Sequence, residues 1–246
     1  MKPQDIIKEK SSLWIFGYGS LVWKPDFEYK RRKIGYIRGY KRRFWHGDDF
    51  HRGDKEKPAR VVTLIADEEA CTWGVAYEVT ECQVEASLQY LNMREVVQGG
   101  YITEMVEFIP KDGHGSVLSL VYIATPDNPM YLGPASDVEI AAQIAICRGN
   151  TGRNIEYLVR LAEFMRHHCP EVADEHLFSI ETASLMILPA LLRYREFAMA
   201  SRLGREQPVI FWAVLMTLCS TFPSATEHPA YHVVMPYVRM LSMVAL

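Results

Sequence analysis

Short apolar runs separated by glycine, proline and aspartate mark the first half of the chain. Residues 13–16 are wholly apolar and stop abruptly at Gly17, so we expect a buried strand that feeds a tight loop. Further runs rich in β-branched and aromatic residues predict more strands, at 33–38, 60–66, 72–79, 101–109 and 116–124. This succession of strands predicts a strongly curved sheet or a small barrel.

One helix interrupts these strands. Val84, Leu88 and Leu91 recur at helical spacing and predict a helix over 82–94 that returns the chain to the sheet. The glycine pair at 99–100 ends this excursion.

The second half of the chain changes character at residues 126–134, where three prolines exclude regular structure and predict a shaped loop. Ser136 with Glu139 three residues later is typical of a capping box at a helix start. Apolar positions then continue at helical spacing, at Ile140, Ile144 and Cys147, at Leu158, Leu161 and Met165, and at Leu177 and Ile180. Strands followed by helices predict the α+β class rather than alternating units with a parallel sheet.

The charge balance gives no sign of a polyanionic partner. The 246 residues carry 27 Lys and Arg against 30 Asp and Glu, a formal charge of −3. This balance argues against nucleic acid and anionic membranes as partners and favours a small molecule or a protein. The apolar run at 209–219 is shorter than the roughly 20 residues that a membrane-spanning helix needs, so we expect no membrane span.

The cysteines and the first residues indicate the compartment. The five cysteines form no CxxC pair, and an odd, widely spread set does not predict a disulfide framework. Residues 1–10 contain no apolar stretch of the length that a secretory signal needs. We therefore expect a cytosolic protein.

The tetrapeptide Gly17-Tyr18-Gly19-Ser20 follows the first predicted strand directly. Because glycine tolerates positive φ, such a loop can turn several backbone N–H groups toward one point and bind a carboxylate or an oxyanion. It lacks the spacing of a dinucleotide GxGxxG motif or of a Walker loop with its lysine. Taken alone, such a glycine pair more often marks an ordinary tight turn.

Glu95 lies near the expected C-terminal end of the helix over 82–94. A carboxylate there opposes the helix dipole, and apolar neighbours such as Met93, Val96 and Val97 would raise its pKa toward the range of a general base. The alternative is a solvated surface glutamate.

Two groups of residues offer metal-ligand side chains, namely His46, Asp48, Asp49 and His51, and His167, His168, Cys169 and His176. Neither has the spacing of a zinc site, so we expect a solvated loop for the first, a polar helix end for the second and no metal. The basic runs 30–33 and 41–43 predict a solvated strand edge, although they also offer charge to an anionic substrate.

These separate signals combine in a resemblance to the ChaC family of glutathione-specific γ-glutamylcyclotransferases, which extends from about residue 13 to about 188. The stretches that carry it are Trp-Ile-Phe-Gly-Tyr-Gly-Ser-Leu-Val-Trp at 14–23, Arg-Gly-Tyr-Lys-Arg-Arg-Phe-Trp at 38–45, His-Arg-Gly at 51–53, Arg-Val-Val-Thr-Leu at 60–64, Trp-Gly-Val-Ala-Tyr at 73–77, Tyr-Leu-Gly-Pro at 131–134, Asn-Ile-Glu-Tyr-Leu at 154–158 and Asp-Glu-His-Leu at 174–177. The spacing Arg-Glu-Val-Val-Gln-Gly-Gly-Tyr at 94–101 is similar to that of stress-induced animal members.

The resemblance implies a γ-glutamylcyclotransferase-like fold, a small mixed β-barrel flanked by helices. Residues 1–12 would then be a lead, 13–188 the domain and 189–246 an extension of uncertain structure. It also implies that glutathione is cut into 5-oxoproline and Cys-Gly without a cofactor, with Glu95 as catalytic base. The substrate cradle that it implies consists of Ile15, Phe16, Gly17, Tyr18, Gly19, Ser20 and Leu21.

Three alternatives stay open. The first is cyclotransfer on other γ-glutamyl compounds. The second is a protein-directed role, because animal members that resemble this chain are said to restrain maturation of the Notch receptor precursor. The third is a hydrolase with a cysteine nucleophile, for which the sequence offers no evident Cys-His pairing.

Overall fold

The structure is a computed structural model that describes residues 12–93 and 100–202. Its elements, in chain order, are β1 (Ser12–Gly17), the 3-10 helix η1 (Ser20–Val22), β2 (Arg31–Asp48), β3 (Ala59–Thr80), α2 (Glu81–Leu91), β4 (Ile102–Pro110), β5 (Val117–Ile123), α3 (Asp137–Ile146), β6 (Arg148–Gly149), β7 (Gly152–Arg153), α4 (Asn154–His168) and α5 (Glu175–Arg202). Strands come first and helices later, so the α+β prediction is confirmed.

Five strands close into a barrel in the order β1-β3-β2-β4-β5. Neighbouring strands run antiparallel except β1 and β5, which close the barrel as a parallel pair with Trp14 opposite Ser119. The small mixed barrel expected from the sequence is therefore confirmed.

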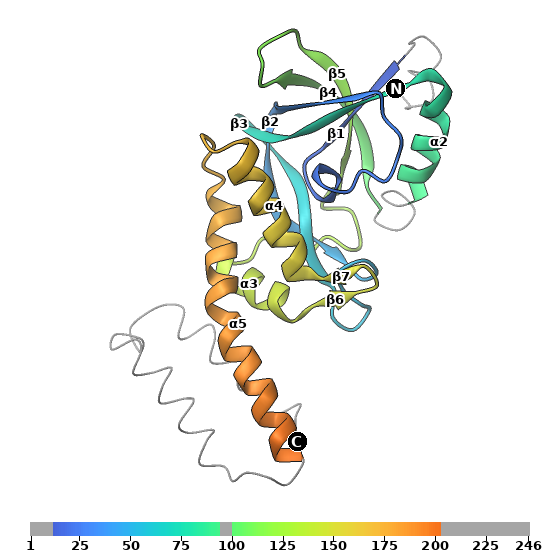
Figure 1. The fold of residues 1–246 in the computed structure, drawn as a ribbon. Helices are drawn as coiled ribbons and strands as arrows, with labels where there is room; N and C mark the ends of the chain where they lie inside the picture. The colour runs from blue at the N-terminus through green and yellow to red at the C-terminus, as the bar shows by residue number, and fades with distance from the viewer. Residues whose placement is uncertain (1–11, 94–99, 203–246) are drawn as a thin grey trace.

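The longest strands are β2 and β3, which form one long, bent hairpin (Figure 1). The separate strands expected at 60–66 and 72–79 are halves of β3, and the strand expected at 33–38 continues to Asp48. The register shifts between Arg38 and Tyr40, where Gly39 has a φ of 82°, a conformation that favours glycine. A bulge thus lets one strand bend where the sequence indicated an end.

Side chains of β1 alternate between two apolar cores, as the two-residue period of a strand requires. Trp14 and Phe16 join the larger core, which extends to α3, α4 and α5, whereas Leu13 and Ile15 join a smaller one under α2. Figure 1 shows α2 beside β1 and the other three helices along the β2–β3 hairpin.

The helix predicted from Val84, Leu88 and Leu91 is present as α2, and all three side chains are buried. The capping box at the start of α3 is also confirmed, because the Ser136 hydroxyl accepts the Glu139 N–H and the Glu139 carboxylate accepts the Ser136 N–H. Residues 124–136 contain no helix or strand, as the prolines predicted.

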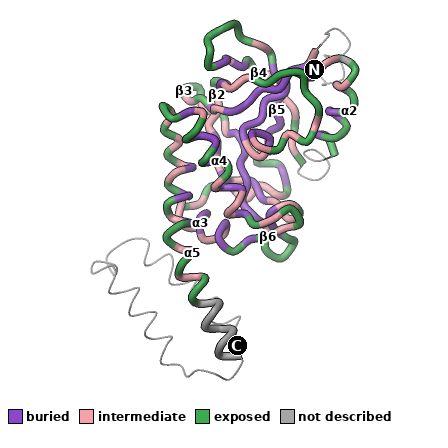
Figure 2. The backbone as a smooth tube through the Cα atoms, in the orientation of Figure 1, coloured by how far each residue is buried: buried purple, intermediate pink, exposed green. Residues whose placement is uncertain are grey.

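The helix α5 extends away from the rest of the domain, and its residues 185–193 are exposed or half-buried (Figure 2). Within the described residues, its segment Glu175–Arg193 is the one helical stretch long and apolar enough to cross a membrane, with a mean hydropathy of 1.2. Length and composition are weak evidence here, because a core helix passes the same test. Leu177 and Ile180 of this segment are fully buried in the larger core.

Candidate active site

A cavity of about 390 Å³ opens where the loop after β1 faces the end of β2. Its walls come from Phe16–Leu21, from the segment His46–Arg52, from Val61 and Val62 of β3 and from residues on either side of the segment 94–99. These segments are far apart in sequence, so closure of the barrel brings them together.

The loop after β1 lines one wall of this cavity, as expected for a substrate cradle. Phe16, Gly17, Tyr18, Gly19, Ser20 and Leu21 all contribute to the wall. Ile15, which the resemblance included, instead places its fully buried side chain in the smaller core under α2.

Neighbouring atoms leave no room for a side chain at the two glycines of this loop. A Cβ on Gly17 would lie 2.5 Å from Cβ of Leu21, and one on Gly19 would lie 2.6 Å from the Tyr157 hydroxyl. Neither glycine is among those with positive φ, so the reason for glycine that the sequence indicated was wrong. The close approach of α4 and of the loop itself demands these residues.

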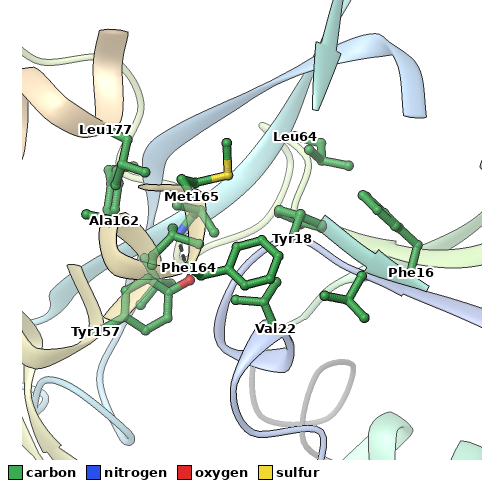
Figure 3. Packing of buried hydrophobic residues seen from close by; sticks show 14 of the residues in the cluster. Phe16, Tyr18, Val22, Leu64, Tyr157, Ala162, Phe164, Met165 and Leu177 are labelled. Carbon is green, nitrogen blue, oxygen red and sulfur yellow. Dashed lines mark hydrogen bonds between the residues drawn. The ribbon is translucent and has the colours of Figure 1, made fainter. Parts of the chain in front are cut away.

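Most of the Tyr18 side chain is buried behind the loop. Its hydroxyl donates a hydrogen bond of 2.7 Å to the backbone carbonyl of Tyr122 on β5, and its ring packs in the larger core. Figure 3 shows Tyr18 among Phe16, Val22 and Leu64 of this core, and its ring stacks with that of Phe16 at a centroid distance of 6.3 Å. The tyrosine therefore anchors the loop to β5, the strand that pairs with β1 where the barrel closes.

The loop carbonyl groups have donors inside the protein. The Gly19 carbonyl accepts the Val22 N–H at 3.0 Å, and the Ser20 carbonyl accepts the Trp23 and Lys24 N–H groups. The Leu21 carbonyl accepts the Tyr77 hydroxyl at 2.7 Å. Burial raises the pKa of Tyr77 to about 12, so this hydroxyl stays a proton donor at neutral pH.

His46 lies at the opposite wall, so the prediction of a solvated loop for this residue was wrong. It belongs to β2, is 1% exposed and packs edge-to-face against Tyr101 with ring centroids 4.7 Å apart. Phe44 and His46 are two residues apart, so both side chains face the interior if this segment is a strand. The sequence predicted a strand only up to residue 38, whereas β2 continues to Asp48, so this signal could not be used.

The segment after His46 is shaped by Asp48. One carboxylate oxygen of Asp48 accepts the N–H groups of Phe50, His51 and Arg52, at 2.9, 2.6 and 3.3 Å. Arg52 is anchored in turn to Glu156 and to the Arg153 carbonyl on the helical side. Among the described residues, no group of three or more His, Cys, Asp or Glu side chains is arranged to hold a metal ion.

The remaining members of the histidine groups have separate roles. His167 and His168 stand at the C-terminal end of α4, as expected for a polar helix end. His176 belongs to α5 and is mostly buried, with Nε2 accepting the Phe44 N–H at 3.1 Å. The prediction of a polar helix end was therefore wrong for His176.

Glu95, the predicted base, lies outside the described residues. Met93, directly before the segment 94–99, and Tyr101, two residues after it, both line the cavity.

Cysteine does not line this cavity within the described part of the chain. Burial raises the pKa of the Cys147 and Cys169 thiols to about 11, which keeps them protonated at neutral pH, and Cys71 and Cys82 are exposed elsewhere. These environments do not favour a thiolate nucleophile.

Comparisons with known proteins agree with this architecture. A glutathione-specific γ-glutamylcyclotransferase 1 of Danio rerio is 68% identical over 193 residues, which cover 78% of this chain and 98% of that protein. The Homo sapiens protein of the same name is 56% identical over 182 residues, or 74% of this chain and 82% of that one. A crystal structure of a yeast γ-glutamyl cyclotransferase specific to glutathione superposes with a TM-score of 0.67 at 29% identity, covering 72% of this chain and 97% of that chain.

The sequence model of the ChaC-like protein family matches residues 13–185, which include the barrel, the cavity-lining loop and the packed part of α5. The chain therefore belongs to the ChaC-like family.

Proposed function

We propose that this protein is a glutathione-specific γ-glutamylcyclotransferase, which converts glutathione into 5-oxoproline and Cys-Gly. Relatives that bear this name are up to 68% identical among those compared, and one of them aligns over 98% of its length. The cavity of about 390 Å³ is within the size range of small-molecule sites.

The reaction is an intramolecular displacement. The α-amine of the γ-glutamyl group attacks the γ-carbonyl carbon and closes a five-membered lactam, while the bond from that carbon to the cysteine nitrogen breaks. One proton leaves the attacking nitrogen and one is gained by the departing nitrogen, so acid–base catalysis suffices and no enzyme nucleophile is needed. The protein must fold the substrate, move this proton and stabilise the oxyanion.

One geometric feature carries this function. The loop Gly17–Leu21 faces the cavity while its carbonyls at Gly19, Ser20 and Leu21 are bound by donors of the protein. A loop held in this way presents backbone N–H groups to an anionic ligand group.

Glu95 supplies the base in this proposal. It would accept the proton that the attacking α-amine nitrogen loses on ring closure and deliver it to the leaving nitrogen. Its support is the resemblance in sequence and the position of the flanking residues Met93 and Tyr101 on the cavity wall.

Incubation of the purified protein with glutathione tests the proposal. We expect equimolar 5-oxoproline and Cys-Gly, identified by mass spectrometry. Release of free glutamate would indicate hydrolysis, and the absence of both products would overturn the proposal.

Two alternatives from the sequence remain predictions. Product analysis with γ-glutamyl-alanine and a γ-glutamyl-amine beside glutathione distinguishes a general cyclotransferase from a glutathione-specific one.

A pull-down with inactive Glu95→Gln protein tests the protein-directed role. Capture of the Notch receptor precursor by this variant would indicate binding that is independent of turnover.

A further inference from the structure

Arg42 is a buried cation directly behind the cavity-lining loop. The sequence placed it on a solvated strand edge, but its side chain is only 3% exposed. Its Nε and Nη2 donate to one carboxylate oxygen of Asp174 at 2.9 and 2.7 Å, and Nη2 also reaches the sulfur of Met165. Its Nη1 donates to the carbonyls of Tyr18 at 2.7 Å and Trp73 at 3.2 Å.

These contacts hold the guanidinium in one orientation. Asp174 neutralises its charge, and the other Asp174 oxygen accepts the Leu177 N–H at the start of α5. The fork geometry of arginine satisfies several acceptors at once, which a lysine ammonium cannot do in the same plane. Arg42 therefore connects the loop after β1 to the barrel and to α5.

The bond to the Tyr18 carbonyl fixes the next N–H group. In a planar trans peptide the C=O and the following N–H point in opposite directions, and no described peptide bond is cis. Tyr18 and Gly19 line the cavity whereas Arg42 does not. With the carbonyl directed back to Arg42, the Gly19 N–H is directed away from the guanidinium.

The Gly19 N–H has no hydrogen-bond acceptor among the described residues. A buried donor without a partner is costly, and one beside a cavity is available to a ligand. The Tyr18 carbonyl accepts a hydrogen bond from the Arg42 cation, and this polarises the Tyr18–Gly19 peptide group. The polarised peptide has a stronger N–H donor at Gly19.

We propose that Arg42 is a positioning residue that acts through this peptide. It directs the Gly19 N–H toward the γ-carbonyl oxygen of the bound substrate, on which negative charge develops during ring closure. The inference rests on the proposed cyclotransfer activity. Because the interaction strengthens in the transition state, loss of Arg42 should lower kcat more than it raises KM.

Arg60 offers a matched control. It is also a buried arginine, 8% exposed, that donates to backbone carbonyls, at Phe44 and Gly133. Its side chain also donates to Gln143, and neither Arg60 nor these three acceptors line the cavity. Arg60→Met therefore removes an equivalent buried guanidinium away from the loop.

The experiment compares the parent, Arg42→Met, Arg42→Lys and Arg60→Met. Glutathione turnover is measured well below the melting temperature of each variant, and the Gly19 amide resonance is followed by ¹H–¹⁵N NMR. Removal of one oxyanion donor typically costs about 10²–10³-fold in kcat, so we expect Arg42→Met to lose at least about tenfold with KM changed less than about twofold. Arg42→Lys should recover part of kcat, because an ammonium still reaches the Tyr18 carbonyl.

The Gly19 resonance should shift in both Arg42 variants and stay in place in Arg60→Met, whose kcat should remain near that of the parent. The inference is overturned if folded Arg42→Met keeps the parental kcat, if it loses no more than Arg60→Met, or if only KM changes. If Arg42→Met does not fold, Arg42→Lys decides: unchanged kcat and an unchanged Gly19 resonance overturn the inference. A parent that makes no 5-oxoproline would refute the proposed function, whereas the Gly19 resonance still shows whether Arg42 orients this peptide.

Discussion

Glu95 is the single side chain on which the proposed chemistry depends most. The substitution Glu95→Gln keeps the size of the side chain and removes its ability to accept a proton near neutral pH. General acid–base catalysis typically contributes about 10²–10⁴-fold, so we expect kcat to fall by at least that order. Stopped assays of 5-oxoproline release measure the change.

Calorimetry with glutathione is the control for this variant. The loop Gly17–Leu21 is intact in Glu95→Gln, so glutathione should still bind, and the melting temperature should match that of the parent. A variant that keeps more than about a tenth of the parental rate would show that Glu95 is not the base, since the loss expected for a base is larger.

His176 makes the stability of the domain depend on pH. Burial, reinforced by the charge of Arg43 on β2, lowers the pKa of His176 below its usual value, against the opposing effect of Asp137 and Asp174. The folded state thus binds a proton less readily than the unfolded chain. Its contribution to the free energy of unfolding is complete above the unfolded pKa of about 6.5 and is lost as the pH falls below that value.

We therefore expect the melting temperature of the parent to decrease between pH 7.5 and pH 5.5 more steeply than that of His176→Gln. Glutamine can still accept the Phe44 N–H bond but does not titrate. Thermal melts across this pH range provide the measurement. Parallel curves for the two proteins would contradict this assignment to His176.

At the scale of one element, the capping box fixes the start of α3. The hydrogen bonds of this box join Ser136 to Glu139, three residues along the chain, so their effect is local. Removal of an N-cap hydroxyl costs about 1 kcal/mol, so Ser136→Ala should lower the free energy of unfolding by about that amount. Urea denaturation detects such a change.

Ser116→Ala, at an exposed position in the turn between β4 and β5, is the control and should change stability far less. Ser136→Ala should also keep the parent's dependence on pH between 7.5 and 5.5, because it leaves His176 in place. Equal stability losses in the two serine variants would show that the cap contributes nothing specific.

At the scale of the molecule, the packed domain ends within α5. Among the residues of this helix whose side chains are described, up to Arg193, the buried ones are Leu177, Ile180, Glu181 and Ser184. All four precede Leu185 and Met186, which are 53% and 66% exposed. A truncation after Leu188 therefore keeps the core contacts and should retain both folding and turnover.

Circular dichroism and glutathione turnover of this truncation are the measurements. A truncation after Ser179, which removes the fully buried Ile180, is the control and should not fold. A folded but inactive protein ending at Leu188 would show that later residues complete the site. An unfolded one would show that they cover part of the core.

Dialysis against a chelator tests the whole protein for a metal requirement. Neither histidine group has the spacing of a catalytic metal site, and lactam closure by the substrate's own amine needs no Lewis acid. Turnover should be unchanged after dialysis. Loss of activity that added zinc restores would overturn this prediction.

Local signals in the sequence determined the elements whose causes are themselves local. The apolar run at 13–16, the helical spacing of Val84, Leu88 and Leu91, and the Ser136 cap all depend on residues within one or two turns of one another. The succession of strands already predicted a curved sheet or a small barrel, and the resemblance to the ChaC family added the prediction of a substrate cradle around Gly17–Leu21. The sequence could not place Ile15, whose side chain faces the core because strand residues alternate.

Only the tertiary structure decided which polar residues are buried at the cavity wall or behind it. Arg42 and His46 lie in a stretch that reads as charged and solvated, yet closure of the barrel buries both. The partner that neutralises Arg42 is Asp174, 132 residues away in sequence. A charge enters the interior only where its counter-charge and acceptors also arrive, and that coincidence of distant residues is absent from any local pattern.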